Sequence, residues 1–108
     1  MKRGDVIVAV FAREFGKPRP SLVVQSDSFS DLNTLVICPL TSDLQGNWPL
    51  RILIEPSPAN GLRQTSHVMI DKIAAITHEH RREKIGELTA EEMDEVSQQL
   101  SLLFGLTD

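Results

Sequence analysis

Two short polar segments, each next to an apolar stretch, hold the side chains best suited to chemistry. Arg19 lies between two prolines, which restrict the backbone and therefore the direction in which the arginine points. Thr41 and Ser42 directly follow the apolar segment 35–40. A guanidinium offers a planar fork of donors and a hydroxyl adds a short neutral donor, so together they suit a phosphate. The alternative is a surface arginine near a turn and a threonine whose hydroxyl satisfies its own backbone.

The sequence favours no metal ion and no cofactor. It lacks the HExxH zinc motif, the phosphate-binding P-loop, the GxGxxG dinucleotide motif and the GxSxG hydrolase motif. His78 and His80 are two residues apart, but no third ligand is evident, so a solvated charged loop is favoured. Cys38 lies in an apolar run and is interpreted as a small buried hydrophobe. One cysteine forms no internal disulfide, which is typical of a reducing compartment.

Length and charge predict one globular domain over residues 1–108 with room for a local basic surface. The net charge is −4, but residues 89–108 contain five acidic side chains and no basic ones. Residues 1–88 therefore hold all 11 basic side chains against the other 10 of the 15 acidic ones. The apolar run 6–12 is interpreted as a strand rather than a leader, and no run approaches the ~18 residues of a membrane span. We expect a cytoplasmic protein.

The chain before residue 89 has the pattern of a β protein. Strands are predicted over 5–11, 21–25, 34–40, 50–55, 68–70, 73–76 and 85–88. The segment 12–20 is predicted to be a loop, and 78–84 a highly charged connection. Pro39 is expected to end regular pairing or to mark a bulge, and Asn60-Gly61 predicts a turn.

The last segment has the pattern of a helix. Thr89 and Glu92 have the spacing of a capping box, and Gly105 is a plausible stop. Apolar residues follow the capping box at helical spacing, namely Met93, Val96, Leu100, Leu103 and Phe104. Short strands with frequent turns and one terminal helix predict a mainly β (α+β) domain, a sandwich or small barrel with the helix across it.

Six segments, in order, resemble the MazF/PemK family of toxins. They are 2–8, 16–24, 36–42, 60–62, 66–73 and 85–88. The resemblance implies an SH3-like small β-barrel with a C-terminal helix, commonly a homodimer. It also implies the toxin of a type II toxin–antitoxin pair, which cleaves single-stranded RNA at specific sequences without a metal, and an antitoxin that blocks its site. The loop before Arg19 is shorter here than in many members.

The resemblance assigns roles to single residues. The catalytic arginine of the family falls on Arg19, and its catalytic threonine or serine falls on Thr41. Arg19 is expected to hold the phosphoryl oxygens, and Thr41 to donate a hydrogen bond to a non-bridging oxygen. The products would be a 2′,3′-cyclic phosphate and a 5′-hydroxyl. Further RNA contacts are expected from Lys17, Ser42, Trp48, His67, Arg81 and Arg82.

Several of these residues have a second interpretation. Trp48 either stacks on a base or anchors the core or a dimer interface. His67 either assists proton transfer or is structural. Arg81 and Arg82 face RNA phosphates, an acidic antitoxin segment or solvent. Asp71 and Lys72 either form an ion pair of the barrel or line a dimer groove.

Two other functions remain open from the sequence. One is a CcdB-like toxin with a related barrel, which inhibits DNA gyrase by protein binding and needs no Arg–Thr site. The other is a catalytically inactive barrel that only binds RNA or a partner. Cleavage of naked RNA by the pure protein separates both from a ribonuclease.

Overall fold

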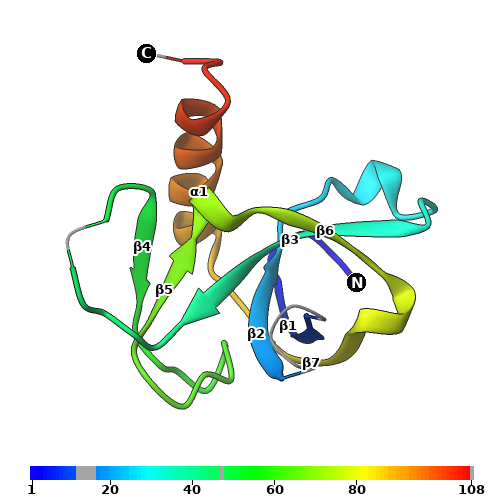
Figure 1. Cartoon of the computed structure of the whole chain (residues 1–108), viewed down its shortest axis with the longest axis horizontal. Coiled ribbons are helices and arrows are strands. Elements are labelled where there is room, and N and C mark those ends of the chain that lie inside the picture. The colour runs from blue at the N-terminus through cyan, green and yellow to red at the C-terminus, as the bar shows by residue number, and fades with distance from the viewer. Residues whose placement is uncertain (12–16, 47, 108) are drawn as a thin grey trace.

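A computed structural model describes residues 1–11, 17–46 and 48–107, and these form one seven-stranded antiparallel sheet and one helix (Figure 1). The elements are β1 (Asp5–Val10), β2 (Pro18–Val23), β3 (Thr34–Thr41), β4 (Arg51–Ile54), β5 (Ser66–Met69), β6 (Ala74–Thr77), β7 (Arg81–Glu87) and α1 (Ala90–Leu103). In the described ranges, 3₁₀ turns lie between these elements at Asp27–Phe29, Ile70–Lys72 and His78–His80. The strand order is β4-β5-β3-β2-β1-β7, and β6 also pairs with β3. The predicted mainly β fold with a terminal helix is confirmed, although this strand path is an open, curved sheet rather than a closed barrel.

β3 is the longest strand and joins the two halves of the sheet. Its first half pairs with β6 (Thr34 with Thr77), and its end pairs with β5 (Leu40 with Val68). Pro39 lies between these two pairings, opposite the 3₁₀ turn Ile70–Lys72. The change of neighbour at this proline agrees with the expected interruption of pairing, because proline has no N–H for a ladder bond.

β2 starts earlier than predicted. The segment 18–20, predicted to be part of a loop, is strand and pairs with β1, with Pro20 opposite Val8. Its pairing with β3 begins only at Ser21. The two prolines therefore lie where one side of β2 is a sheet edge, which is where strands tolerate proline. The predicted loop residues 12–16 lie outside the described residues.

β7 also starts earlier than predicted. The segment 78–84 was expected to be a connection, but only its first three residues form a turn, and Arg81 begins a strand that pairs with β1. Its side chains are mostly exposed or half-buried and charged, so they show no apolar alternation. Charged residues of this kind protect an edge strand from unwanted pairing. They also remove the apolar pattern by which a strand is recognised in a sequence.

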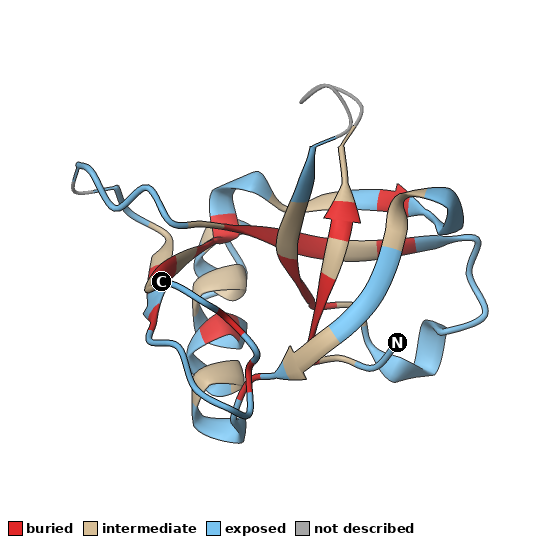
Figure 2. Cartoon of the chain, turned by 90° about the horizontal axis from the view of Figure 1, so that it is seen from below, coloured by how far each residue is buried: buried red, intermediate tan, exposed pale blue. Residues whose placement is uncertain are grey.

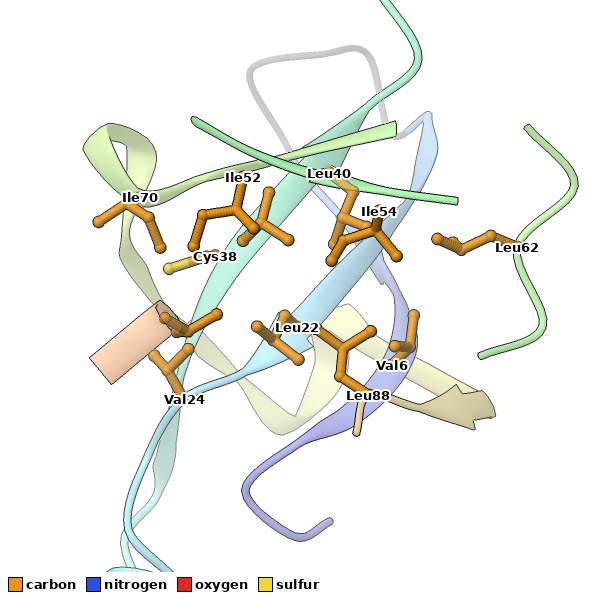
Figure 3. Close-up of a cluster of buried hydrophobic side chains, with 12 residues drawn as sticks. Val6, Leu22, Val24, Cys38, Leu40, Ile52, Ile54, Leu62, Ile70 and Leu88 are labelled. Carbon is orange, nitrogen blue, oxygen red and sulfur yellow. The ribbon is translucent and has the colours of Figure 1, made fainter. Parts of the chain in front are cut away.

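Two apolar clusters hold the sheet and the helix together. The larger lies between the sheet and α1 and includes Leu22, Leu40, Ile54 and Val96 (Figure 3). The smaller lies on the other face of the sheet, around Ile37. In Figure 2 the buried residues follow the strands and one face of the helix, whereas the connecting segments are mostly exposed. None of the helices in the described ranges is long and apolar enough to cross a membrane.

Both predicted ends of α1 are confirmed. Thr89 Oγ1 accepts a bond from the N–H of Glu92, and the Glu92 carboxylate accepts one from the N–H of Thr89, at 3.1 and 2.8 Å. At the other end Gly105 has a φ of 71°, and Leu106 N–H donates to the carbonyl of Ser101, which is a Schellman motif. Phe104, expected on the apolar face, is 57% exposed because it lies at the C-cap, past the last packed turn.

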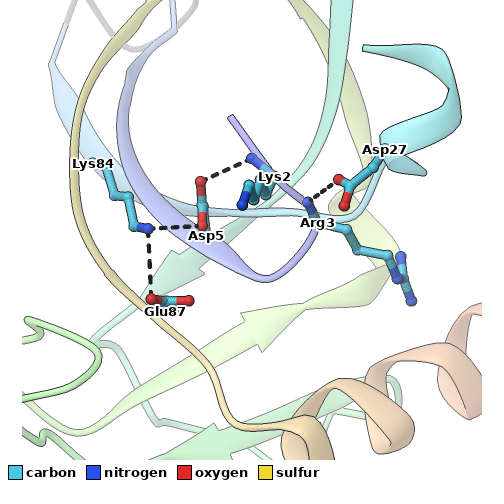
Figure 4. Close-up of polar contacts among 6 residues, drawn as sticks. All are labelled: Lys2, Arg3, Asp5, Asp27, Lys84 and Glu87. Carbon is cyan, nitrogen blue, oxygen red and sulfur yellow. Dashed lines mark hydrogen bonds and ion pairs between the residues drawn. The ribbon is translucent and has the colours of Figure 1, made fainter.

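Polar contacts tie the N-terminus to the rest of the sheet (Figure 4). The carboxylate of Asp5 is buried and lies 3.2 Å from Lys84 Nζ, and it accepts a bond from the N–H of Lys2 at 2.8 Å. Arg3 donates its backbone N–H to Asp27 and its guanidinium to Ser97 of α1, at 2.7 and 2.6 Å. These contacts satisfy a carboxylate that would be costly to bury alone.

Candidate functional site

A cavity of about 500 Å³ opens beside the ends of β2 and β3. It collects residues from five strands (β1, β2, β3, β5 and β7), from the positions next to β2 and β3, and from the segment that connects β4 to β5. The lining residues are Val8, Lys17, Pro18, Arg19, Pro20, Leu40, Thr41, Ser42, Gly61, Leu62, Arg63, Gln64, Ser66, Glu83 and Ile85. The cavity therefore brings together four of the site residues predicted from the sequence. Arg19 and Thr41 are the two with expected catalytic roles, and Lys17 and Ser42 are two of the expected RNA contacts.

Arg19 is held at the cavity by the backbone of β2. It pairs with Ala9 of β1, and the hydroxyl of Ser21 donates to the Arg19 carbonyl at 3.3 Å. Ser21 is fully buried and pairs with Pro39 of β3, so this part of β2 is fixed on both sides. Arg19 is half-buried and belongs to a strand rather than a loop, which lowers the entropy cost of holding an anion.

Thr41 ends β3 and is half-buried at the cavity. Its Oγ1 accepts a hydrogen bond from the backbone N–H of Asp43 at 3.1 Å. A hydroxyl that accepts one bond can still donate its own hydrogen, and here the bond fixes where the oxygen lies. The arrangement presents Thr41 as an oriented donor beside the planar donor fork of Arg19.

The segment before β5 and strand β7, which pack together, form a wall of the cavity with polar residues that the sequence did not single out. Arg63 and Gln64 come from the segment before β5, and Glu83 comes from β7. Sequence patterns gave no chemical signal here, because 56–63 was recognised only as a turn region and 78–84 only as a charged connection. The Asn60-Gly61 turn, which is confirmed with a Gly61 φ of 70°, was the one local pointer to this wall.

The charges around the cavity favour an anion. Its lining contains three basic side chains, Lys17, Arg19 and Arg63, and one acidic side chain, Glu83. This excess is notable in a chain whose net charge is −4. A concave surface lined by one sign of charge concentrates ligands of the opposite sign. The site can therefore hold a phosphodiester and donate hydrogen bonds to its oxygens.

His67 and Trp48 lie outside this lining, within the part of the chain that the structure describes. His67 is inside β5 rather than before it and pairs with Thr41, so the two side chains project from the same face of the sheet. Trp48 is 62% exposed, which makes the core interpretation of this residue wrong. Its ring centroid lies 5.7 Å from the guanidinium carbon of Arg51, a cation–π contact on the surface.

Arg81 and Arg82 also lie outside the cavity lining among the described residues. Arg81 is half-buried and pairs with Ala9, which pairs in turn with Arg19, so the two arginine backbones are two strand spacings, or about 10 Å, apart. Arg82 is exposed and donates to the carbonyls of Glu79 and Arg81. The Arg82 guanidinium therefore stabilises the adjacent turn His78–His80.

Asp71 and Cys38 lie outside the cavity lining and have shifted pKa values with structural causes. A hydrogen bond from Arg51 lowers the pKa of Asp71, whose carboxylate accepts from the guanidinium at 2.8 and 3.2 Å. An ion pair is thus found for Asp71, and its partner is Arg51 of β4. Burial raises the pKa of the Cys38 thiol to about 12, in agreement with its interpretation as a buried hydrophobe. Within the described ranges no three His, Cys, Asp or Glu side chains gather to hold a metal ion.

The structure is similar to solved toxins. It superposes with a TM-score of 0.84 on an endoribonuclease in complex with its cognate antitoxin from a mycobacterial species, at 22% identity, covering 100% of this chain and 98% of that one. The TM-score is 0.79 for MazE–MazF from Deinococcus radiodurans, at 24% identity, covering 99% and 97% of the two chains. At these identities the likeness establishes the fold.

The sequence comparisons establish the family. The chain is 34% identical over 107 residues to a protein from Mycolicibacterium smegmatis named probable endoribonuclease MazF. The alignment covers 98% of each of the two chains. Residues 2–104 match the family described as PemK-like, MazF-like toxin of type II toxin-antitoxin system. The chain therefore belongs to the PemK-like, MazF-like toxin family of type II toxin–antitoxin systems.

Proposed function

We propose that this toxin is a sequence-specific endoribonuclease that cleaves single-stranded RNA, such as mRNA, without a metal ion or cofactor. The observation that carries the proposal is that Arg19 and Thr41, distant in sequence, line one cavity with an excess of basic side chains. The relative from Mycolicibacterium smegmatis, named a probable endoribonuclease, supports the same activity. The CcdB-like alternative is less favoured, because it would give no reason for this cluster.

The proposed reaction uses the nucleophile that RNA itself carries. The 2′-oxygen attacks the adjacent phosphorus and loses its proton, the P–O5′ bond breaks, and the leaving 5′-oxygen takes up a proton. The products are a 2′,3′-cyclic phosphate and a 5′-hydroxyl. The protein aligns the 2′-oxygen with the leaving oxygen and stabilises the charge that develops on the phosphoryl oxygens.

Arg19 and Thr41 divide this work. The Arg19 guanidinium holds the phosphoryl oxygens, and a role as general base is disfavoured because guanidinium groups do not deprotonate in proteins. The Thr41 hydroxyl donates to a non-bridging oxygen, aided by the bond from Asp43 N–H that fixes its position. Lys17 and Ser42 line the same cavity and contact the phosphate or ribose of the bound strand.

The remaining predicted RNA contacts lie outside the cavity, so they require an RNA segment that extends beyond it. We propose that Trp48 stacks on an unpaired base, because its ring is exposed next to Arg51 and aromatic stacking is a common way to bind single strands. His67 projects beside Thr41, and Arg81 lies across β1 from Arg19. Arg82 binds its own turn and is the weakest of these candidates.

An antitoxin and a second copy of the chain are the proposed protein partners. A related endoribonuclease was solved with its cognate antitoxin, which supports an antitoxin that covers the cavity. Large apolar side chains at the end of α1 are exposed, with Leu102 at 45%, Phe104 at 57% and Leu106 at 74%, and a partner would cover them. We propose a cytoplasmic homodimer, and light scattering of the pure protein measures its mass.

The test is cleavage of a long single-stranded RNA by the pure protein in EDTA. We expect discrete fragments with 5′-hydroxyl ends. Arg19→Ala and Thr41→Val each lower the rate by at least about 100-fold, the typical effect of losing one donor to the transition state. Valine keeps the β-branched shape that a strand prefers, so Thr41→Val removes little besides the hydroxyl.

Lys2→Ala is the charge-matched control, because it removes one positive charge from an exposed side chain outside the cavity among the described residues and keeps the backbone bond to Asp5. It should cleave at nearly the wild-type rate. Intact RNA with the wild-type protein rejects the proposal; a gyrase supercoiling assay then tests the CcdB-like function, and a salt-dependent shift without products indicates a binding-only barrel. Equal rates in wild type and Arg19→Ala reject the assigned site.

A further inference from the structure

We propose that Arg63 binds a second phosphate, next to the one that is cleaved, so that the site takes two successive phosphates of a single strand. The inference rests on the proposed ribonuclease function and adds a binding residue that lines the same cavity as Arg19 and Thr41 but comes from a different segment of the chain. Arg63 is in the segment between β4 and β5, whereas Arg19 and Thr41 are in β2 and β3.

The short segment that carries Arg63 is anchored on both sides. Leu62, directly before it, is 8% exposed and points into the apolar cluster beside Ile54 (Figure 3). Ser66, three residues after it, is 5% exposed and begins β5, where its hydroxyl donates to the carbonyl of Gln64 at 2.9 Å. The backbone at Arg63 is thus restricted, and a positioned guanidinium loses less entropy when it binds an anion.

The preceding turn is built around the buried side chain of Asn60. Its Oδ1 accepts from the backbone N–H groups of Ser57 and Leu62, both at 3.0 Å, and its Nδ2 donates to the carbonyl of Glu55 at 2.9 Å. Asn60 is 3% exposed, so these bonds are shielded from water. They hold the turn that precedes Arg63 in the chain in one conformation.

The same turn is packed directly on the backbone of β7. The Glu87 N–H donates to the carbonyl of Ala59 at 2.9 Å, and a Cβ atom at Gly61 would overlap the carbonyl oxygen of Ile85. A Cβ atom at Gly86 would likewise overlap the backbone of Asn60. Two glycines therefore bring these segments together, and the wall that carries Arg63 is continuous with the sheet that carries Arg19.

The charges explain why a second phosphate is expected. One phosphodiester carries one negative charge, but the cavity lining has three basic side chains against Glu83. The cavity has a volume of about 500 Å³, which is in the range of small-molecule sites. This volume is larger than a single phosphate group needs. A single-stranded RNA whose scissile phosphate lies at Arg19 can therefore place the adjacent phosphate against Arg63.

The first experiment measures binding without cleavage. A short single-stranded 2′-O-methyl oligonucleotide lacks the nucleophile, so its affinity is measured over a range of salt concentrations. Loss of one phosphate contact lowers the slope of log affinity against log salt by about 0.7 for a single strand. We expect this change for Arg63→Ala and not for Arg63→Lys or for the control Lys2→Ala, which removes one positive charge outside the cavity lining. An unchanged slope in Arg63→Ala overturns the inference.

The second experiment takes its main result from the wild-type protein, so it still tests the inference if Arg63→Ala fails to fold. Phosphates of the oligonucleotide are replaced one at a time by neutral methylphosphonates, and binding to the wild-type protein is measured. We expect two adjacent sensitive positions, one of which loses its sensitivity in Arg63→Ala. A single sensitive position overturns the inference.

Failure of the inference and failure of the proposed function give different results. If long RNA is not cleaved but two adjacent phosphates matter, the ribonuclease proposal is wrong and Arg63 still binds a polyanion. If RNA is cleaved and Arg63→Ala has the wild-type KM and salt slope, the ribonuclease stands and the assignment of Arg63 is wrong. With both correct, Arg63→Ala raises KM about tenfold and changes kcat much less, whereas Arg19→Ala mainly lowers kcat.

Discussion

Gly61 and Ile85 meet through their backbones, because a Cβ atom at position 61 would overlap the Ile85 carbonyl oxygen and lie 2.8 Å from its carbonyl carbon. This contact joins the turn before β5 to the edge strand β7. Both segments line the cavity, so its shape depends on how closely they pack. The glycine has two independent reasons to be there: this close approach and a φ of 70°.

Gly61→Ala is expected to destabilise the protein by at least about 2 kcal/mol, from the left-handed backbone and the steric overlap together. Gly105→Ala is a matched control: its φ is 71°, and a Cβ atom there meets no atom within 4 Å among the described residues. It should cost only the backbone term, about 1 kcal/mol. Urea unfolding measures both, and equal losses would show that the contact with Ile85 contributes nothing.

The Arg51–Asp71 pair is expected to make stability depend on pH in the acid range. The hydrogen bond from Arg51 lowers the pKa of Asp71 below its unfolded value of 3.8. The folded state therefore binds fewer protons there, and this stabilisation is present above the unfolded pKa and lost as the pH falls through the folded pKa. The pair is partly exposed, so its contribution is at most about 1 kcal/mol.

Asp71→Asn tests this by urea unfolding at neutral pH and near pH 3. The variant should be less stable than wild type at neutral pH, and the difference should shrink in acid. Arg51→Met should behave in the same way, and the double variant should add little to either change. A difference that stays constant with pH would assign the effect to packing, including the contact of Arg51 with Trp48.

Cys38 is expected to be unreactive in the folded protein. Removal from water by burial raises the pKa of its thiol from 9.0 to about 12, which lowers the thiolate fraction at neutral pH by about a thousandfold. A chromogenic disulfide reagent should therefore label native protein at least that much more slowly than protein in 6 M guanidinium, where one thiol reacts. Rapid labelling of native protein would contradict the burial of this side chain.

Thr89→Ala is expected to destabilise the protein by about 1 kcal/mol, the usual cost of losing an N-cap side chain. Its hydroxyl accepts from the N–H of Glu92 at 3.1 Å, and alanine cannot replace that bond. Thr89→Ser keeps the oxygen and should retain most of the stability. Thermal unfolding followed by far-ultraviolet circular dichroism measures all three proteins; equal losses in the two variants would point to the methyl group instead.

The elements predicted well from sequence are those whose signals are local. The capping box of α1 and the apolar run of β3 depend on residues adjacent in the chain, and both are confirmed. The starts of β2 and β7 were missed. Prolines and charges argue against strands locally, whereas here each segment pairs with β1 and has a free edge that tolerates them.

The sequence by itself indicated the family, the positions of most strands along the chain and the two residues proposed for catalysis. It did so because Arg19 and Thr41 each lie in a short motif whose neighbours are adjacent in the chain. Only the tertiary structure decided that Arg63 and Glu83 face the same cavity and that Trp48 does not line it within the described residues. These facts depend on the approach of Gly61 to Ile85 and on the path of the strands, which are long-range contacts that no local pattern encodes.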